Sequence, residues 1–185
     1  FVTPYAYAAH DVFTVEHRNL HTWAMRFGGG LAILPVALAV VLALLADHSR
    51  QPEQQPLRAA LISSMGLFAA GGLIGLAIGA NNVKIPAHYH GCIVGVTLAL
   101  MGVVYHLLPR LGYAAPRSRL ATLQPWLYGG GQLLHIVGLV WSGGYGVQRK
   151  VAGSEQVLRN SAEVAGMGLM GLGGLLAIAG GLLFV

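Results

Sequence analysis

Five long apolar runs, separated by short polar loops, constrain the fold of this chain more than any other feature. Roughly 20 mostly apolar residues are needed for a helix to cross the hydrocarbon core of a bilayer. The runs are Phe27 to Ala46, Ala59 to Val83, Ile85 to Leu108, Leu123 to Val147 and Val164 to Val185. Only 9% of the 185 residues are charged, so composition excludes an ordinary soluble protein. The sequence predicts an all-α, polytopic membrane bundle with five transmembrane helices (27–185) after an extramembrane segment (1–26).

Glycine is abundant, with 27 residues, and it lies inside or at the edges of the apolar runs. The main groups are Gly28-Gly29-Gly30, Gly71-Gly72, Gly129-Gly130-Gly131 and the series Gly166, Gly168, Gly171, Gly173 and Gly174. Small residues in membrane helices let neighbouring backbones, or a flat cofactor, come close. Helix packing is the favoured interpretation, because packing around a macrocycle also requires ligands for its metal.

The most informative polar motif is Pro86-Ala87-His88-Tyr89-His90-Gly91, at the head of the third run. Histidine is costly in hydrocarbon and rarely sits there without a partner. Because each residue turns a helix by about 100°, His88 and His90 project roughly 200° apart. Such a pair does not easily hold one metal ion, but it can reach two spaces on opposite sides of the helix. This geometry suits two separate haem irons; the alternative is two buried imidazoles bonded to backbone or water.

Other histidines carry weaker predictions. His135 lies in the middle of the fourth run, where we expect it to hydrogen-bond a haem edge or a neighbouring helix, with ligation less favoured. The N-terminal histidines, His10, His17 and His21, are expected in a solvated, mildly charged loop in preference to a peripheral metal site. Cys92 is the only cysteine, so a disulfide within the chain is excluded.

Charge does not settle the orientation in the membrane. With five crossings, the N-terminal segment, the loop at Lys84 and the 148–163 loop share one side, and Lys and Arg are nearly balanced between the two sides. If Lys84, Arg149 and Lys150 are neutralised by a bound anion, the remaining positive charge favours the opposite side as cytoplasmic. The net charge of +5 gives no reason to expect a nucleic-acid partner.

Several segments, taken in order, resemble the catalytic subunit I of the haem–copper oxidases. They are Gly71-Gly72-Leu73-Ile74-Gly75, Ala87-His88-Tyr89-His90, Tyr105-His106-Leu107-Leu108-Pro109, Gly112-Tyr113, and the turn from Gly144 to Lys150. Their order, spacing and sidedness agree from about Leu61 to Val185, and the stretch corresponds to the eighth to twelfth helices of that family. The resemblance implies that this bundle is part of a twelve-helix oxidase-type fold.

The resemblance also implies roles for four residues. His88 would be the proximal ligand of a high-spin haem where oxygen is reduced, and His90 one axial ligand of a neighbouring low-spin haem. Arg149 and Lys150 would meet haem propionates through charge-assisted hydrogen bonds. The implied activity is that of a respiratory terminal oxidase, an oxidoreductase that takes electrons from cytochrome c or quinol and reduces O2 to water.

Departures from the family pattern point to missing parts. The chain has no His-x-x-x-Tyr or His-His element for a copper site, and a second axial ligand for the low-spin haem is not evident. The copper is therefore expected on partner helices. An obligate partner, other oxidase subunits or a missing N-terminal half would supply about seven helices. The 80–86 loop lacks the family's His-Asp pair, so no non-redox metal is expected there, and Gln148 stands where the family has proline.

The expected location is the bacterial inner (cytoplasmic) membrane, with the propionate side facing the periplasm.

Alternatives remain open at this stage. The same frame supports a nitric oxide reductase-type subunit, in which the second metal is iron. A dihaem electron carrier is disfavoured because such proteins usually pair histidines from different helices. A non-catalytic structural subunit, or a haem-binding remnant without copper chemistry, would retain the fold alone.

Overall fold

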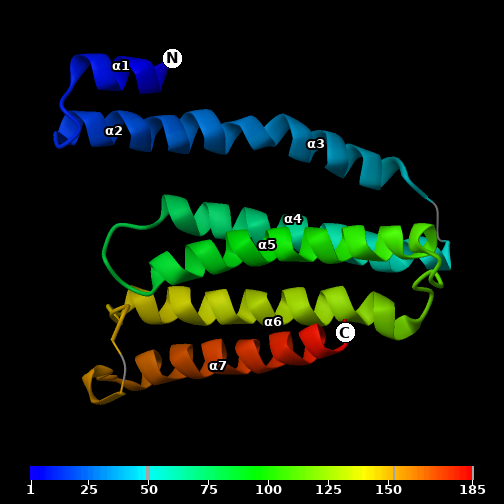
Figure 1. The fold of residues 1–185 in the computed structure, drawn as a ribbon. Coiled ribbons are helices and arrows are strands. Elements are labelled where there is room, and N and C mark those ends of the chain that lie inside the picture. Colours follow the sequence, from blue (N-terminus) through cyan, green and yellow to red (C-terminus); the bar gives the residue numbers. More distant parts are fainter. Residues whose placement is uncertain (49–50, 152, 185) are drawn as a thin grey trace. The chain divides into compact units, whose positions relative to one another are not determined.

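The computed structural model describes residues 1–48, 51–151 and 153–184. Within these ranges the chain is helical and has no β-strand, which confirms the all-α prediction. The elements are α1 (Val2–Ala9), α2 (Val15–Trp23), the π-helical turn η1 (Ala24–Gly29), α3 (Gly30–Ala46), the 3₁₀ turn η2 (Pro52–Gln54), α4 (Gln55–Leu76), α5 (Lys84–Leu107), η3 (Leu108–Leu111), α6 (Arg119–Gly144), η4 (Gly153–Glu155) and α7 (Ser161–Leu182) (Figure 1).

Four helical segments of the described chain are long and apolar enough to cross a membrane. They are Val15–Ala46, Pro52–Leu76, Lys84–Leu111 and Ser161–Leu182. The remaining predicted span is α6, which at 26 residues is about 39 Å long and so has the required length. Its interior carries Gln124, Gln132 and His135, which make it less apolar than the other four. Val185, the predicted end of the last span, lies outside the described residues.

Two helix boundaries differ from the predicted runs by seven residues or more. The first run was expected to begin at Phe27, but the helix already begins at Val15, where the Thr14 side chain accepts a hydrogen bond from the His17 backbone N–H. The second run was expected to reach Val83, but α4 ends at Leu76. The residues that follow contain glycine and two asparagines, Asn81 and Asn82, which favour a turn over a continued helix.

The chain divides into two compact units, Phe1–Ser49 and Arg50–Val185. In the first unit, α1 folds back along α2, and η1 leads into α3 (Figure 1). No residue of α3 is buried, although the helix is apolar all round. Such a helix is suited to lipid or to other membrane helices as its surroundings. The first predicted transmembrane helix therefore shares a unit with the N-terminal segment.

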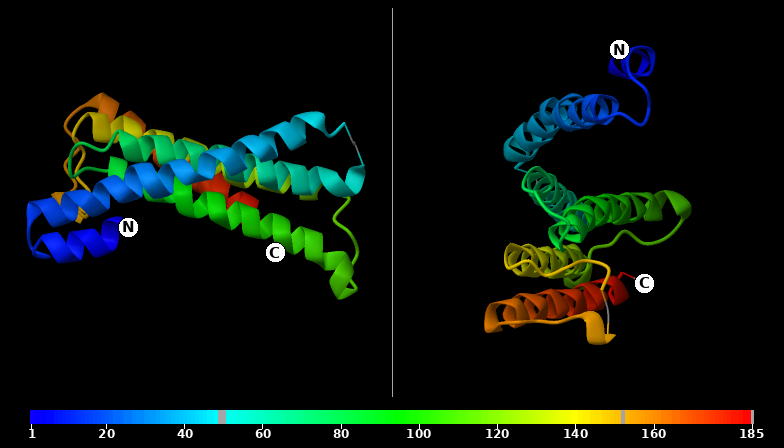
Figure 2. Two further views of the ribbon diagram at one scale, coloured as in Figure 1. Left: turned by 90° about the horizontal axis from the view of Figure 1, so that it is seen from above. Right: turned by 90° about the vertical axis from the view of Figure 1, so that its left-hand side faces the viewer.

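The second unit consists of α4 to α7. Helix α4 packs along α5, α6 packs along α7, and both α4 and α5 contact α6, so α7 is joined to the unit chiefly through α6 (Figures 1 and 2). The core between the helices is formed by eight buried apolar residues: Leu67, Val83, Ala87, Val94, Leu98, Ile136, Leu139 and Val147. Two helical hairpins thus meet along one shared apolar core.

Glycines set how closely the helices of each hairpin approach. A Cβ added to Gly71 in α4 would lie 2.6 Å from the Cys92 backbone nitrogen in α5. In the other hairpin, a Cβ on Gly131 would lie 2.5 Å from the Ala177 nitrogen, and one on Gly180 would lie 2.5 Å from the Tyr128 nitrogen. Real Cβ atoms do not approach backbone so closely, so these positions require glycine. The helix-packing interpretation of these glycines is confirmed.

Candidate functional site

His88 lies in the first turns of α5 and faces α4. Its Nδ1 is 2.7 Å from the backbone carbonyl oxygen of Gly71. A carbonyl oxygen only accepts hydrogen bonds, so Nδ1 must be the donor, which leaves Nε2 of the neutral ring as a free lone pair. Gly75, one turn further along α4, makes room for the ring, because a Cβ there would lie 2.6 Å from Nδ1. A metal-ligating imidazole needs one such unprotonated ring nitrogen.

His90 faces a different helix. Its ring centroid lies 5.0 Å from that of His135 in α6, with the two rings tilted by 54°. It also stacks on the neighbouring Tyr89, with ring centroids 5.4 Å apart and an interplanar angle of 28°. His88 therefore contacts α4 and His90 contacts α6, which agrees with the divergence expected from their i, i+2 spacing. One segment of α5 presents two half-buried imidazoles to two different surroundings.

A buried asparagine joins the two turns at this end of the second unit. The Asn82 Nδ2 donates to the Gly143 carbonyl at 3.0 Å, and its Oδ1 accepts the backbone N–H of Lys84, also at 3.0 Å. The Val83 N–H donates to the Val147 carbonyl at 3.2 Å, and an isolated antiparallel bridge pairs Asn82 with Gln148. The turn before α5 and the turn after α6 are therefore at the same end, as the predicted topology requires.

This junction places Arg149 at the end of the unit where the His88–His90 helix begins. The Arg149 Nε donates to Asn81 Oδ1, in the turn before α5. Lys150 is exposed and has a φ of 63°, a left-handed conformation that few residues other than glycine adopt. Neither cation hydrogen-bonds to His88 or His90 within the described chain. The four predicted site residues thus share one end of the unit without forming a single contact cluster.

No group of three or more His, Cys, Asp or Glu side chains comes together for a metal ion among the residues that the structure describes. Haem iron takes only one or two axial ligands from the protein, so this finding concerns free metal ions and not haem.

The position of His135 beside His90 could not be predicted from the sequence. Its Nδ1 is 3.0 Å from the carbonyl oxygen of Met170 in α7, which confirms the expected bond to a neighbouring helix. Its contact with His90 depends on the register of α5 against α6, which no local motif reveals. The only signal in the sequence was a histidine in the middle of an apolar helix.

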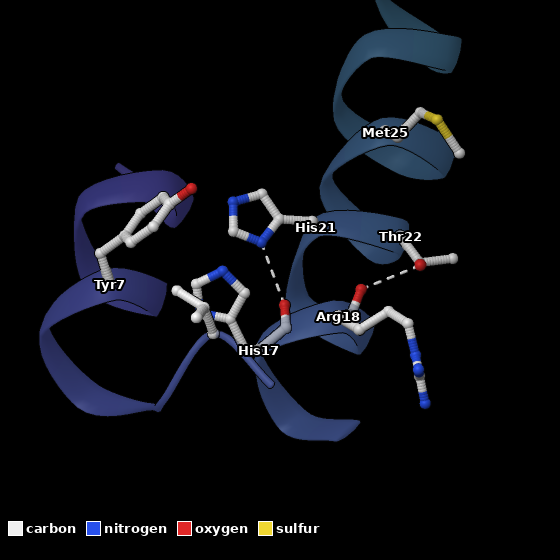
Figure 3. Close-up of a pocket in the computed structure, with 7 residues that line it drawn as sticks. Tyr7, His17, Arg18, His21, Thr22 and Met25 are labelled. Carbon is white, nitrogen blue, oxygen red and sulfur yellow. Dashed lines mark hydrogen bonds between the residues drawn. The ribbon is translucent and has the colours of Figure 1, made fainter. Parts of the chain in front are cut away.

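Two of the N-terminal histidines, His17 and His21, lie together inside the first unit (Figure 3). His17 is only 7% exposed, and its Nδ1 lies 3.2 Å from the Ala6 carbonyl oxygen. The His21 Nδ1 lies 3.0 Å from the His17 carbonyl oxygen, and the Tyr7 ring packs edge-on against His17 at 4.7 Å. The prediction of a solvated loop is therefore wrong for His17, because Ala6 and Tyr7 of α1 fold back over α2.

The chain is 32% identical, over 98% of its length, to an uncharacterized protein of Rickettsia prowazekii, and 25% identical over 52% of its length to an uncharacterized protein of Aquifex aeolicus. It spans 42% and 23% of the lengths of these relatives. No solved structure matches it. The model of the family described as cytochrome c and quinol oxidase polypeptide I matches residues 2–177, so the chain belongs to that family.

Proposed function

We propose that this chain is the haem-ligating portion of a respiratory terminal oxidase. In this proposal His88 would hold a high-spin haem and His90 a low-spin haem, and the two groups would supply the electron transfer and the reduction of O2 to water. The observation that carries the proposal is the His88 hydrogen bond to the Gly71 carbonyl, which leaves Nε2 free to ligate. Membership of the oxidase subunit I family supports haem as the group bound.

The residues present suit two haems held by one helix. When bound, the haems would supply electron transfer and oxygen chemistry. The chain's own part is to fix the two imidazoles on one rigid segment of α5, with His88 braced by α4 and His90 placed beside α6. Buried apolar residues further along α5, such as Val94 and Leu98, exclude water from the helix interface. A fixed, close spacing of the ligands removes the need for a moving electron carrier.

Arg149 and Lys150 suit the propionates of such haems. Both lie at the polar end of the second unit, and Arg149 is already oriented by Asn81. A guanidinium offers a planar fork to a carboxylate, whereas Lys150 offers a point charge, so the two contacts would differ in geometry. We place this end on the periplasmic side of a bacterial inner membrane.

The proposal requires partner helices. Large apolar side chains are widely exposed, among them Leu73 at 68%, Ile93 at 61% and Leu175 at 66%. The chain also spans less than half the length of the relatives that it matches. We propose that further helices, on another subunit or another part of the protein, supply the copper ligands and the second axial ligand of the low-spin haem. Cytochrome c or quinol would be the electron donor.

Alanine substitution of each histidine tests the proposal in the purified complex. His90→Ala is expected to remove the low-spin haem absorption and leave a carbon monoxide-binding haem. His88→Ala is expected to remove the carbon monoxide-binding haem and leave the low-spin one. Circular dichroism checks that both variants remain helical. If either variant retains both haem signals, the assignment of that histidine is wrong.

A further inference from the structure

A second imidazole, that of His135, lies beside His90, and its packing shows which of its ring nitrogens donates a hydrogen bond. The His135 Nδ1 lies 3.0 Å from the Met170 carbonyl oxygen, so Nδ1 carries the proton and donates it. The neutral ring therefore has an unprotonated Nε2, which can only accept. Gly174 of α7 lies beside this ring, since a Cβ added there would be 3.6 Å from the His135 Nδ1. His135 is thus a hydrogen-bond acceptor held in place by two helices.

His90 lacks the support that His88 has. A histidine that ligates a metal almost always donates its other ring N–H to an acceptor, which fixes the ring and increases its basicity. His88 has the Gly71 carbonyl for this purpose. The described contacts of the His90 ring are with Tyr89, which stacks on it, and with His135. Tyr89 lies nearly parallel to the His90 ring, so its hydroxyl is out of the plane in which the ring N–H points. Of these two neighbours, His135 is therefore the better placed acceptor.

The separation of the two rings distinguishes a directly contacting pair from two ligands of one haem. A haem held between two axial imidazoles needs about 6 Å or more between ring centroids, given metal–nitrogen bonds of about 2 Å. The observed 5.0 Å is shorter than this. Among the described contacts no hydrogen bond joins the two rings, which are tilted by 54°. Their separation is close to the value expected for two imidazoles joined by a hydrogen bond of ~2.9 Å, so a change in ring orientation would form one. His135 is therefore suited to support the His90 ring and unsuited to be the opposite axial ligand of the same haem.

We propose that His135 is the positioning residue for the low-spin haem ligand, accepting a hydrogen bond from the His90 ring N–H through its own Nε2. The relay runs from His90 to His135 and on to the Met170 carbonyl, and it links α5, α6 and α7. It rests on the proposed function, because it assigns His90 to the low-spin haem. When the ring N–H that does not ligate the iron donates to an acceptor, the ligating imidazole becomes more electron-rich. The reduction potential of the haem is then lower.

Two substitutions distinguish the role of His135 in packing against α7 from its role as a hydrogen-bond acceptor. In His135→Asn, the shorter amide can still donate to the Met170 carbonyl, but no acceptor remains at the position of Nε2. In His135→Gln, an amide oxygen can reach that position. The measurements are the haem content, the midpoint potential and the electron paramagnetic resonance g-values of the low-spin haem in the intact, haem-loaded complex.

We expect His135→Asn to retain the low-spin haem, with an upward shift in its midpoint potential and altered g-values. His135→Gln should lie closer to the wild type in both measurements. Unchanged potential and g-values in His135→Asn would overturn the inference. So would loss of the low-spin haem in His135→Asn combined with its retention in His90→Ala, because His135 would then be the ligand itself. Wild-type protein without any low-spin haem would instead contradict the proposed function.

Should His135→Asn not accumulate, His135→Ala takes its place, because it also removes the acceptor. An upward shift in potential in His135→Ala that is smaller in His135→Gln supports the relay, and a wild-type potential in His135→Ala overturns it. Complete loss of the low-spin haem in a folded His135→Gln complex would overturn it.

Discussion

The backbone carbonyl of Gly71 decides what the His88 imidazole can do, since it fixes the proton on Nδ1 and leaves Nε2 free. A similar carbonyl, that of Met170, fixes the proton of His135. Both acceptors come from helices other than the one that carries the histidine. Chemistry at the scale of one residue therefore depends on packing between helices.

Gly75 provides a direct test of the His88 position. In Gly75→Ala the new Cβ would lie 2.6 Å from Nδ1, so the ring must turn away from the Gly71 carbonyl. Loss of such a supporting contact typically weakens metal binding about 10- to 100-fold. We expect the carbon monoxide-binding haem to be largely lost on purification, as measured by the carbon monoxide difference spectrum.

Gly72→Ala is the matched control, because nothing lies within 4 Å of a Cβ at that position. It should retain the carbon monoxide signal of the wild type. Equal signals from the two variants would show that the His88 ring does not need its present position.

The divergence of His88 and His90 could be predicted from the sequence because it depends only on the turn of one helix. The proximity of His90 to His135 could not, because it depends on how far α5 and α6 are shifted along one another. Similarly, the end of α4 was misplaced because alanine and isoleucine after Leu76 prolong the apolar run without prolonging the helix. Hydropathy locates membrane spans better than it locates their ends.

At the scale of helices, glycines repeat at intervals of seven residues along the α6–α7 contact. They are Gly131 and Gly138 in α6, and Gly166, Gly173 and Gly180 in α7. A Cβ added at any of these positions would lie 2.5 Å or less from an atom of the facing helix. The sequence revealed that glycine was concentrated in these runs, but not which glycines face a neighbour.

Gly138→Ala should separate α6 from α7, because its Cβ would press on the Met170 backbone, which cannot move aside as a side chain can. Overpacking of this kind costs about 1–3 kcal/mol. We expect the free energy of unfolding in mixed detergent micelles to fall by that amount.

Gly130→Ala, with open space around its Cβ, serves as the control and should unfold like the wild type. A Gly138→Ala protein as stable as Gly130→Ala would mean that α6 and α7 are not packed as closely as described.

At the scale of the whole molecule, two features bear on function. The described chain has four helices apolar enough to span a membrane, plus α6, and large apolar side chains are exposed along them. It covers 42% of the length of its Rickettsia relative. Membership of the oxidase subunit I family could be expected from the His88–His90 helix and its flanking motifs, because these local patterns survive without the rest of the fold.

The central claim, that α5 ligates two haems, is tested most directly by difference spectra of the natively purified complex. Reduced-minus-oxidised and carbon monoxide difference spectra should be recorded together with iron and copper content. The account predicts two haems per complex, one of which binds carbon monoxide, together with copper. Two haems with additional iron and no copper would assign the complex to nitric oxide reduction. A purified complex without haem would contradict the account and leave the chain as a structural subunit.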